Sequence, residues 1–592
     1  MEKSVERTIE DKVDKYHLSN TFLKNERGTA VLHALRAFED SIKMAPSVFE
    51  AKGLISNKLG DRDIVINNFI DGLDQTIKWI FECCPYGVSS VEIDYNGKIN
   101  FAASQTLIQS MRYNRICDGY TLFSRDRQIV EYNEENNQLT FRFKNDDQGK
   151  REAADLFLAQ NTKEDDLEKA LKAIPSSIIN CFDLEKEIYY NEQGLQYVIS
   201  EEKSNSFDLI SKTQVEYFSE LPESWKMHGF TLGQFRQVWE VLLTKSMIHE
   251  AACKSSKEVG GAVEHIVMIT TFEDLSKEIT DKSKVAKEQV RLILKTLLYD
   301  ASITNSHVIW QPIISLDDIN IAIAPNLIMN SNFERNLICL LNKIAQPEYS
   351  RLSNLKEEIM LDDLSEKLKL YSNISVSTAK KLPVPLPDMD LILYDKNRKV
   401  LFLAEIKWLL SIDSIKEICA RDKDFEKGVS QAKLIKEYAL ENTSDVLNRA
   451  FGQIDLEVNQ IYSCVISKNN IGSSFIDSSA KIINEASFLK ILADTNGDLL
   501  EVIGIIDNNL FLPKAGVDYN LNQIEISYGN QNFMVQSVSL NTELPNTEKV
   551  NLTPMKSEKG KIKLRRNDPC FCGNINEKTG KVYKFKKCCG ET

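Results

Sequence analysis

The sequence predicts an α/β core that is preceded by a mainly helical region with small β-hairpins and followed by a small cysteine-rich knuckle. Three observations lead to this prediction. Two short apolar runs near the middle of the second half flank a polar tetrad, and helix-like and strand-like segments follow them. Much of the first half carries apolar residues at helical spacing. Four cysteines lie close together near the C-terminus.

The core is predicted from a β-hairpin. Residues 391–394 and 400–404 are apolar and β-rich, and the four residues that follow Asp395 are polar. If Asn397 and Arg398 form a two-residue loop, the numbers of any two residues that face each other across the hairpin add up to 795.

Charged residues fall at paired positions of this hairpin. In the predicted register Asp390 faces Glu405, and Asp388 faces Lys407. Because side chains alternate along a strand, Asp390, Glu405 and Lys407 share one face. Two carboxylates and a lysine inside apolar strands are costly unless they are paired or bind a cation, so the arrangement indicates a metal site. The alternative is a salt-bridged surface hairpin.

Asp388 or Asp390, followed by Glu405-Ile406-Lys407, resembles the motif of the PD-(D/E)xK nucleases, which have the restriction-endonuclease-like fold. The resemblance implies that Asp390, Glu405 and the main-chain carbonyl of Ile406 hold Mg²⁺ or Mn²⁺. It also implies that Lys407 positions or activates the attacking water. Asp388 occupies the literal place of the motif's first Asp. Asp390 is preferred because it opposes Glu405 and begins the apolar strand.

The segments around the hairpin fit the same core. Residues 432–440 are spaced as an amphipathic helix and 460–472 begin as a strand, so the order strand–strand–helix–strand is that of the nuclease core. Gln431 and Lys433 could reach substrate or water at the metal from this helix. The alternative for both is a solvated helix face.

Upstream of the hairpin, Asn332 is a candidate N-cap for a helix over residues 333–345. The family often carries a glutamate on its first helix, and the resemblance makes Glu334 the candidate for this role. An ordinary first-turn glutamate that complements the helix dipole is the alternative.

The C-terminal cysteines form a C-x-C…C-C pattern, a four-thiolate set suited to tetrahedral Zn²⁺. With the flanking Asn-Asp-Pro, glycine and Tyr-Lys residues, the pattern resembles the SEC-C zinc-binding motif, although the 15 residues between the two pairs exceed the usual spacing. The other eight cysteines show no motif spacing, and no secretory signal is recognised, so a reducing cytoplasm is expected. The predicted zinc ligands are Cys570, Cys572, Cys588 and Cys589.

The charge of the tail differs from that of the rest. Residues 551–592 contain 11 Lys and Arg against 4 Asp and Glu, whereas the whole chain has a net charge of −13. A basic tail suits contact with nucleic acid, DNA more than RNA, or with an acidic protein partner. The overall acidity argues against a protein that coats DNA.

Length and composition set the outer limits. The chain has 592 residues, 42% hydrophobic and 27% charged, which is ample for several cores. No apolar run reaches the ~18–20 residues that cross a bilayer. The predicted division is a mainly helical, regulatory region 1–315, a nuclease domain 316–540, a flexible linker 541–566 and a zinc-binding motif 567–592.

The first half carries no recognisable chemistry. It has no Walker A pattern, and its six histidines lack metal-binding spacing, so they are expected to be structural. Helices are predicted over residues 29–45, 62–84, 152–160, 231–255 and 283–301. Hairpins are predicted over residues 89–104, 127–144, 186–200, 501–516 and 522–538, the last two as extensions of the nuclease sheet.

These features together predict a Mg²⁺-dependent endonuclease that hydrolyses phosphodiester bonds of DNA. A nuclease core fused to a large region without its own motor resembles nucleases of bacterial antiviral defence or repair, by analogy alone. Two alternatives remain open. One is an adaptor with a degenerate nuclease fold that binds a protein or RNA through its zinc tail. The other is a ribonuclease that uses the same site.

Overall fold

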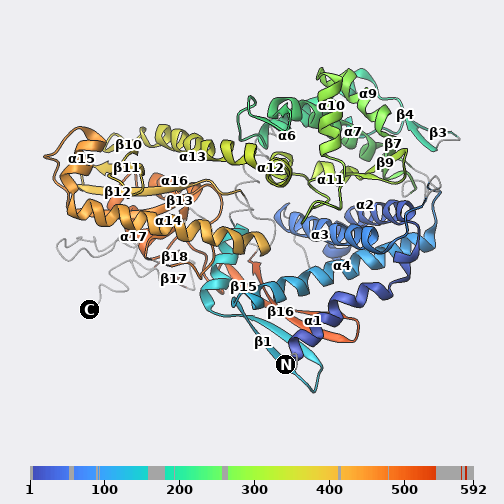
Figure 1. Ribbon diagram of the computed structural model, residues 1–592, viewed down its shortest axis with the longest axis horizontal. Helices are drawn as coiled ribbons and strands as arrows, with labels where there is room; N and C mark the ends of the chain where they lie inside the picture. The colour runs from blue at the N-terminus through green and yellow to red at the C-terminus, as the bar shows by residue number, and fades with distance from the viewer. Residues whose placement is uncertain are drawn as a thin grey trace.

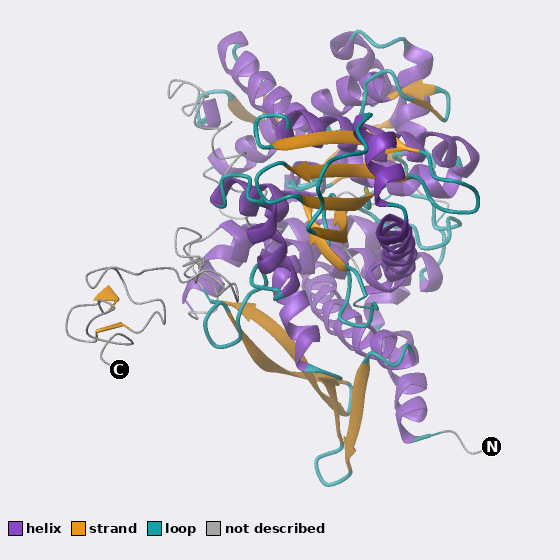
Figure 2. Ribbon diagram, turned by 90° about the vertical axis from the view of Figure 1, so that its left-hand side faces the viewer, coloured by secondary structure: helices purple, strands orange, loops and turns teal. Residues whose placement is uncertain are grey.

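The chain is described by a computed structural model and forms a mixed α/β architecture (Figures 1 and 2). A five-stranded sheet with its helices lies at one end in Figure 1, and the N-terminal helices lie at the other. The structure describes residues 4–51, 59–87, 91, 94–157, 181–191, 194–256, 264–410, 415–477, 479–541, 575–576 and 581–582.

The five-stranded sheet has the order β10-β11-β12-β13-β14. β11 runs antiparallel to both of its neighbours, β10 and β12, whereas β12, β13 and β14 run parallel to one another. The strands are β10 (Ile374–Lys380), β11 (Met389–Asp395), β12 (Val400–Lys407), β13 (Gln460–Ser467) and β14 (Lys481–Asn484).

Helices cover both faces of this sheet. One face packs on α13 (Gln346–Leu368), α16 (Glu485–Asp494) and α17 (Leu499–Asp507). The other packs on α14 (Ile415–Glu441) and α15 (Thr443–Phe451). A strand covered on both faces reads as a nearly continuous apolar run, which explains why all eight residues of β12 are buried.

The pairing of β11 with β12 confirms the predicted register. Leu391 pairs with Ala404, and Asp395 pairs with Val400. The loop, however, has four residues instead of two. The buried carboxylate of Asp395 accepts hydrogen bonds from the main-chain N–H groups of Asn397 and Arg398, and this Asx turn holds the wider loop without shifting the register.

The N-terminal region is helical, as predicted. Three long helices, α2 (Arg27–Ala51), α3 (Leu59–Cys83) and α4 (Gly97–Ser124), pack against one another. Farther along the chain, helices surround a small sheet of order β7-β9-β8. These elements are α6 (Glu201–Tyr217), α7 (Leu232–Ser255), β7 (Met268–Thr271), α9 (Phe272–Ser283), α10 (Lys287–Thr296), β8 (Ile313–Ser315), β9 (Asn320–Ile323), α11 (Pro325–Met329) and α12 (Phe333–Ile344). The predicted helices 29–45, 62–84, 231–255 and 283–301 correspond to α2, α3, α7 and α10.

The predicted domain boundary near residue 315 does not interrupt the packing. One hydrophobic core extends from Cys181 to Ile506 and includes the α13 face of the five-stranded sheet. Trp239 on α7 stacks on Phe333 on α12, with ring centroids 5.6 Å apart. Residues on both sides of the predicted boundary therefore share one core.

A second sheet joins strands from the first and second halves of the chain. Its order is β1-β2-β16-β15, in which β16 (Gln531–Leu540) runs parallel to β2 (Gln138–Phe143). β1 (Gln128–Asn133) and β15 (Tyr519–Tyr528) are its outer strands. The hairpin predicted over 522–538 is therefore confirmed. Its predicted place in the nuclease sheet is wrong, because β16 pairs with a strand from the first half.

Two predicted hairpins are helical. Asn96 does not form the centre of a turn; its side chain accepts hydrogen bonds from the N–H groups of Lys98 and Ile99 and caps α4. Asparagine is favoured both in turns and at helix N-caps, and the long-range packing of α4 selects the N-cap here. Residues 501–516 begin within α17, because a short continuous apolar run does not distinguish a strand from a buried helix.

Other short elements complete the described chain. The predicted hairpins 127–144 and 186–200 are present as β1-β2 and β3-β4. A helix over 146–157 overlaps the prediction for 152–160. The remaining elements are α1 (Val5–Lys15), the 3₁₀ helices η1 (Tyr16–Ser19) and η2 (Thr21–Lys24), β3 (Ile188–Asn191), β4 (Gly194–Tyr197), β5 (Lys226–Met227), β6 (Phe230–Thr231), β17 (Ile575–Asn576) and β18 (Lys581–Val582). Among the described residues, no helix is long and apolar enough to cross a membrane.

Candidate metal centre

Asp390, Glu405 and Lys407 lie together where β11 begins and β12 ends. Ile392 on β11 and Leu403 on β12 face α14, in the core between the sheet and this helix. Alternation places Asp390, Glu405 and Lys407 on this same side. The shared face that the sequence predicts is therefore present in the structure.

Asp390 is held in place by the neighbouring strand. Its Oδ2 atom accepts a hydrogen bond of 2.9 Å from the main-chain N–H of Ile406. In a strand, the N–H and the C=O of one residue point to the same side, so the carbonyl of Ile406 is directed toward β11 as well. Asp388, by contrast, is exposed and precedes the strand. The geometry supports Asp390 as the carboxylate of the pair.

Lys407 links two acidic side chains. Its Nζ atom lies 2.7 Å from Oε1 of Glu405 and 4.0 Å from Oε1 of Glu357, which is on α13. Glu405 is buried, with 3% of its surface exposed, whereas the side chain of Glu357 is 41% exposed. The ammonium group thus stands between a buried carboxylate and one that reaches solvent.

Burial controls the protonation of the carboxylates. It raises the pKa of Asp390 to about 6, against the lowering effect of the Ile406 N–H and of Lys407. Burial, together with the nearby Asp390, raises the pKa of Glu405 to about 7. Burial by itself would lower the pKa of Lys407, but Glu405 and Glu357 outweigh it, so this pKa is raised and the ammonium is retained.

The donor set fits a divalent cation. Within the described part of the chain, Oε2 of Glu405 is buried and has no hydrogen-bond partner, which is costly for a carboxylate. Oxygen ligands from Asp390, Glu405 and the carbonyl of Ile406 match the preference of Mg²⁺ and Mn²⁺. A cation at this position would satisfy the orphaned oxygen and neutralise the buried acidic pair.

Helix α14 closes the site from one side. At Gly428 an added Cβ atom would lie 3.3 Å from Cε of Lys407, so the glycine lets the helix pack closely on this side chain. Gln431, one turn on, is half-buried, and its Oε1 atom has no hydrogen-bond partner among the described residues. Lys433 is exposed, as expected if it lies on a solvated helix face.

Glu334 does not join this group, and the prediction that placed it there is wrong. Its Oε2 atom lies 2.9 Å from Nε of Arg236, and its Oε1 atom accepts the N–H groups of Glu220 and Leu221. The carboxylate is 3% exposed and fully engaged by these partners. The helix itself is correct: α12 begins at Phe333 with Asn332 as its N-cap.

Glu357 is the residue that sequence reasoning missed. It lies on α13, which follows α12 directly and leads into the first strand of the sheet. Pro347 occupies the first turn of α13, where its missing N–H is harmless. Residues 346–368 show little helical amphipathicity, so the local pattern offers no clear sign of this helix or of Glu357.

The predicted zinc ligands Cys570, Cys572, Cys588 and Cys589 lie outside the described residues, as does the linker 541–566 apart from Asn541. Of the predicted motif, the structure describes only β17 and β18, which pair antiparallel. They fall between the two cysteine pairs, so the long spacing contains a short hairpin.

The arrangement of Asp390, Glu405 and Lys407 is thus built by strand alternation, by the Ile406 N–H and by the close approach of α14. No protein-family model, curated protein or solved structure matches this chain.

Proposed function

We propose that the chain is a metal-dependent nuclease that hydrolyses phosphodiester bonds of DNA, with its active site at Asp390, Glu405 and Lys407. The observation that carries this proposal is the unpartnered Oε2 atom of Glu405, buried beside Asp390 at the ends of two paired strands. A buried and a half-buried carboxylate that lie side by side repel each other, and a cation is the ordinary means of stabilising such a pair.

The element order supports the same proposal. Helix α13, the antiparallel strands β10, β11 and β12, helices α14 and α15 and the parallel strand β13 follow one another along the chain. This order contains the strand–strand–helix–strand succession expected of a PD-(D/E)xK core, with one helix and one strand added at its start and the short helix α15 added before β13. Glu357 on α13 supplies the first-helix glutamate that the resemblance implies.

Each residue has a role that follows from its contacts. Asp390 and Glu405, with the carbonyl of Ile406, would hold Mg²⁺ or Mn²⁺. When bound, the cation supplies Lewis-acid stabilisation of charge on the phosphate. The ammonium of Lys407 orients water and offsets negative charge beside the phosphate, and Glu357 holds Lys407 from the open side.

The zinc motif and the basic tail would add a binding function. Four cysteines at 570, 572, 588 and 589 would hold one Zn²⁺, and the surrounding lysines suit a phosphate backbone or an acidic protein surface. In this proposal the tail recruits substrate or a partner, and the α/β core performs the cleavage.

The test is cleavage of labelled double-stranded DNA, single-stranded DNA and RNA with Mg²⁺, Mn²⁺ or EDTA. The wild type is expected to cut DNA only with metal, and Glu405→Gln is expected to lose this activity. Glu358→Gln, an exposed glutamate on α13, is the matched control. Cleavage of RNA alone would favour the ribonuclease alternative. Tight binding without metal-dependent cleavage of any substrate would favour the adaptor.

A further inference from the structure

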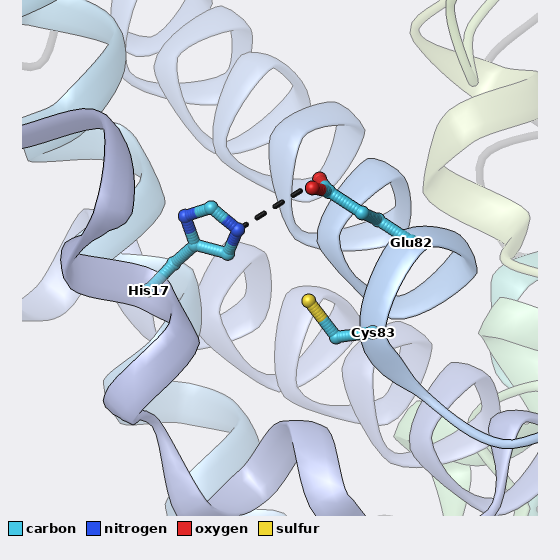
Figure 3. A group of neighbouring side chains, drawn as sticks. All are labelled: His17, Glu82 and Cys83. Carbon is cyan, nitrogen blue, oxygen red and sulfur yellow. Dashed lines mark ion pairs between the residues drawn. The ribbon is translucent and has the colours of Figure 1, made fainter. Parts of the chain in front are cut away.

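A second group of metal-capable side chains lies far along the chain from the acidic pair, in the N-terminal region. His17 is on η1, and Glu82 and Cys83 are at the end of α3 (Figure 3). The imidazole points toward Glu82, and the sulfur of Cys83 lies on the same side of the helix end. Sixty-five positions separate His17 from Glu82, so no local sequence spacing signals this group.

The imidazole of His17 is buried, and its hydrogen-bonding capacity is unused among the described residues. The residue is 6% exposed, and neither ring nitrogen has a hydrogen-bond partner within the described part of the chain. The ring stacks on Trp79 with centroids 4.9 Å apart and planes 2° from parallel, which fixes its orientation. Its Nε2 atom faces Oε2 of Glu82 at 3.7 Å, too far for a hydrogen bond.

The spacing of the three donors suits a bound cation better than direct contact. The Nε2, carboxylate oxygen and Sγ atoms all lie within 4.8 Å of one another. Around a tetrahedral Zn²⁺, ligand atoms are separated by about 3.3–3.8 Å, given metal–ligand bonds of about 2.0–2.3 Å. The exposed side chain of Glu82 and the helix-end position of Cys83 leave room for the small closure required.

We propose that Nε2 of His17, the carboxylate of Glu82 and Sγ of Cys83 bind a zinc-type divalent cation, with water at the fourth position. Imidazole and thiolate select a borderline metal such as Zn²⁺ over Mg²⁺. This site is separate from the acidic pair at Glu405 and from the cysteine-rich tail. It does not depend on the proposed nuclease activity.

Such a site would lie beside contacts between the N-terminal segment and the β15-β16 hairpin. Trp79, on which His17 stacks, contacts Tyr113 edge-on, and Tyr113 approaches Tyr528 at the tip of β15. Tyr16, the neighbour of His17, also packs on Tyr528, with ring centroids 4.9 Å apart. A cation on His17 would therefore fasten η1 to α3 beside the aromatic cluster that packs on Tyr528 of the β15-β16 hairpin.

The experiment is residue-resolved alkylation of the full chain with N-ethylmaleimide, with and without Zn²⁺, read by peptide mass spectrometry. Cys83 is half-exposed, so it reacts in the metal-free protein. Zn²⁺ is expected to slow its alkylation on the order of tenfold, because coordination removes the free thiolate. Cys339, also half-exposed, is the internal reference and should not respond. Peptide masses separate Cys83 from the tail cysteines.

Two variants test the ligands. His17→Phe keeps a ring to stack on Trp79 but removes the nitrogen donor, and Glu82→Gln changes an exposed side chain. Both should abolish zinc protection of Cys83. Cys84→Ser is the matched control, because the Cys84 thiol donates to the carbonyl of Leu23 and takes no part in the group. Unprotected Cys83 in the wild type, or protection that survives His17→Phe, would overturn the proposal.

Discussion

The Oδ2 atom of Asp390 accepts a 2.9 Å hydrogen bond from the main-chain N–H of Ile406 across the hairpin. This bond fixes one carboxylate oxygen and leaves the other available for a cation. It also ties the aspartate of β11 to the residue between Glu405 and Lys407 on β12. This interaction therefore adds to the strand pairing in positioning the proposed metal ligands.

The variant Asp390→Asn tests whether Asp390, and not its neighbour Asp388, is the metal ligand. The amide preserves the size of the side chain and can still accept from Ile406, but it removes the charge that holds a cation. We expect metal-dependent cleavage to fall by at least about 100-fold, as for loss of a group that stabilises transition-state charge. Asp388→Asn, at an exposed position before the strand, should stay within about threefold of the wild type. The reverse ranking would assign the site to Asp388.

Metal binding should depend on pH. Because burial raises the pKa of Asp390 to about 6 and that of Glu405 to about 7, protons compete with a cation below neutral pH. Without metal, these raised values favour the folded state at low pH. Their contribution is lost as the pH rises from the unfolded values near 4 through about 7. Added Mn²⁺ should therefore raise Tm clearly at pH 8 and little at pH 5.5. Differential scanning fluorimetry measures this, and an equal rise at both values would contradict it.

Glu357 should influence Lys407 without holding the metal by itself. Glu357→Gln removes one of the three carboxylates that raise the pKa of Lys407, while Glu405 remains 2.7 Å away. We expect cleavage to fall on the order of tenfold, as for loss of a residue that supports a ligand or a catalytic group. Glu358→Gln controls for the loss of charge on the same helix. Equal activity of the two variants would remove Glu357 from the site.

Local patterns predicted the parts of the fold that local interactions decide. Alternation and turn composition predicted the register of β11 with β12, because a one-residue slip would turn Asp390 and Glu405 to the opposite face. The loop length was wrong, since it depends on the carboxylate of Asp395 and on the N–H of Leu499, 104 residues away, which that carboxylate also binds. The register survived because the side chains on the strands determine it.

Long-range packing determines the features that local sequence patterns did not predict. Asn96 has the local features of both a turn and an N-cap, and the contacts of α4 with α2 and α3 select the cap. The partner of β16 is β2, roughly four hundred positions earlier in the chain, and no local pattern specifies it. His17, Glu82 and Cys83 show the same limit at the level of a site, because only the fold brings them together.

The last prediction concerns Glu334, whose partners indicate a role in stability and not in metal binding. Its carboxylate pairs with Arg236 on α7 and receives the N–H groups of Glu220 and Leu221. Removing one partner of a buried ion pair leaves the other charge uncompensated, which typically costs about 3–5 kcal/mol. Glu334→Ala should lower the free energy of unfolding by about this amount while the affinity of the folded protein for Mn²⁺ is unchanged. Denaturant unfolding and calorimetric titration measure the two quantities.

The double variant Arg236→Met with Glu334→Leu separates charge burial from packing. It removes both charges and fills the space with apolar side chains, so most of the stability lost in Glu334→Ala should return. The N–H groups of Glu220 and Leu221 would still lack an acceptor, so recovery is expected to fall short of the wild type. A stable Glu334→Ala protein that binds Mn²⁺ at least tenfold more weakly would instead return Glu334 to the metal site.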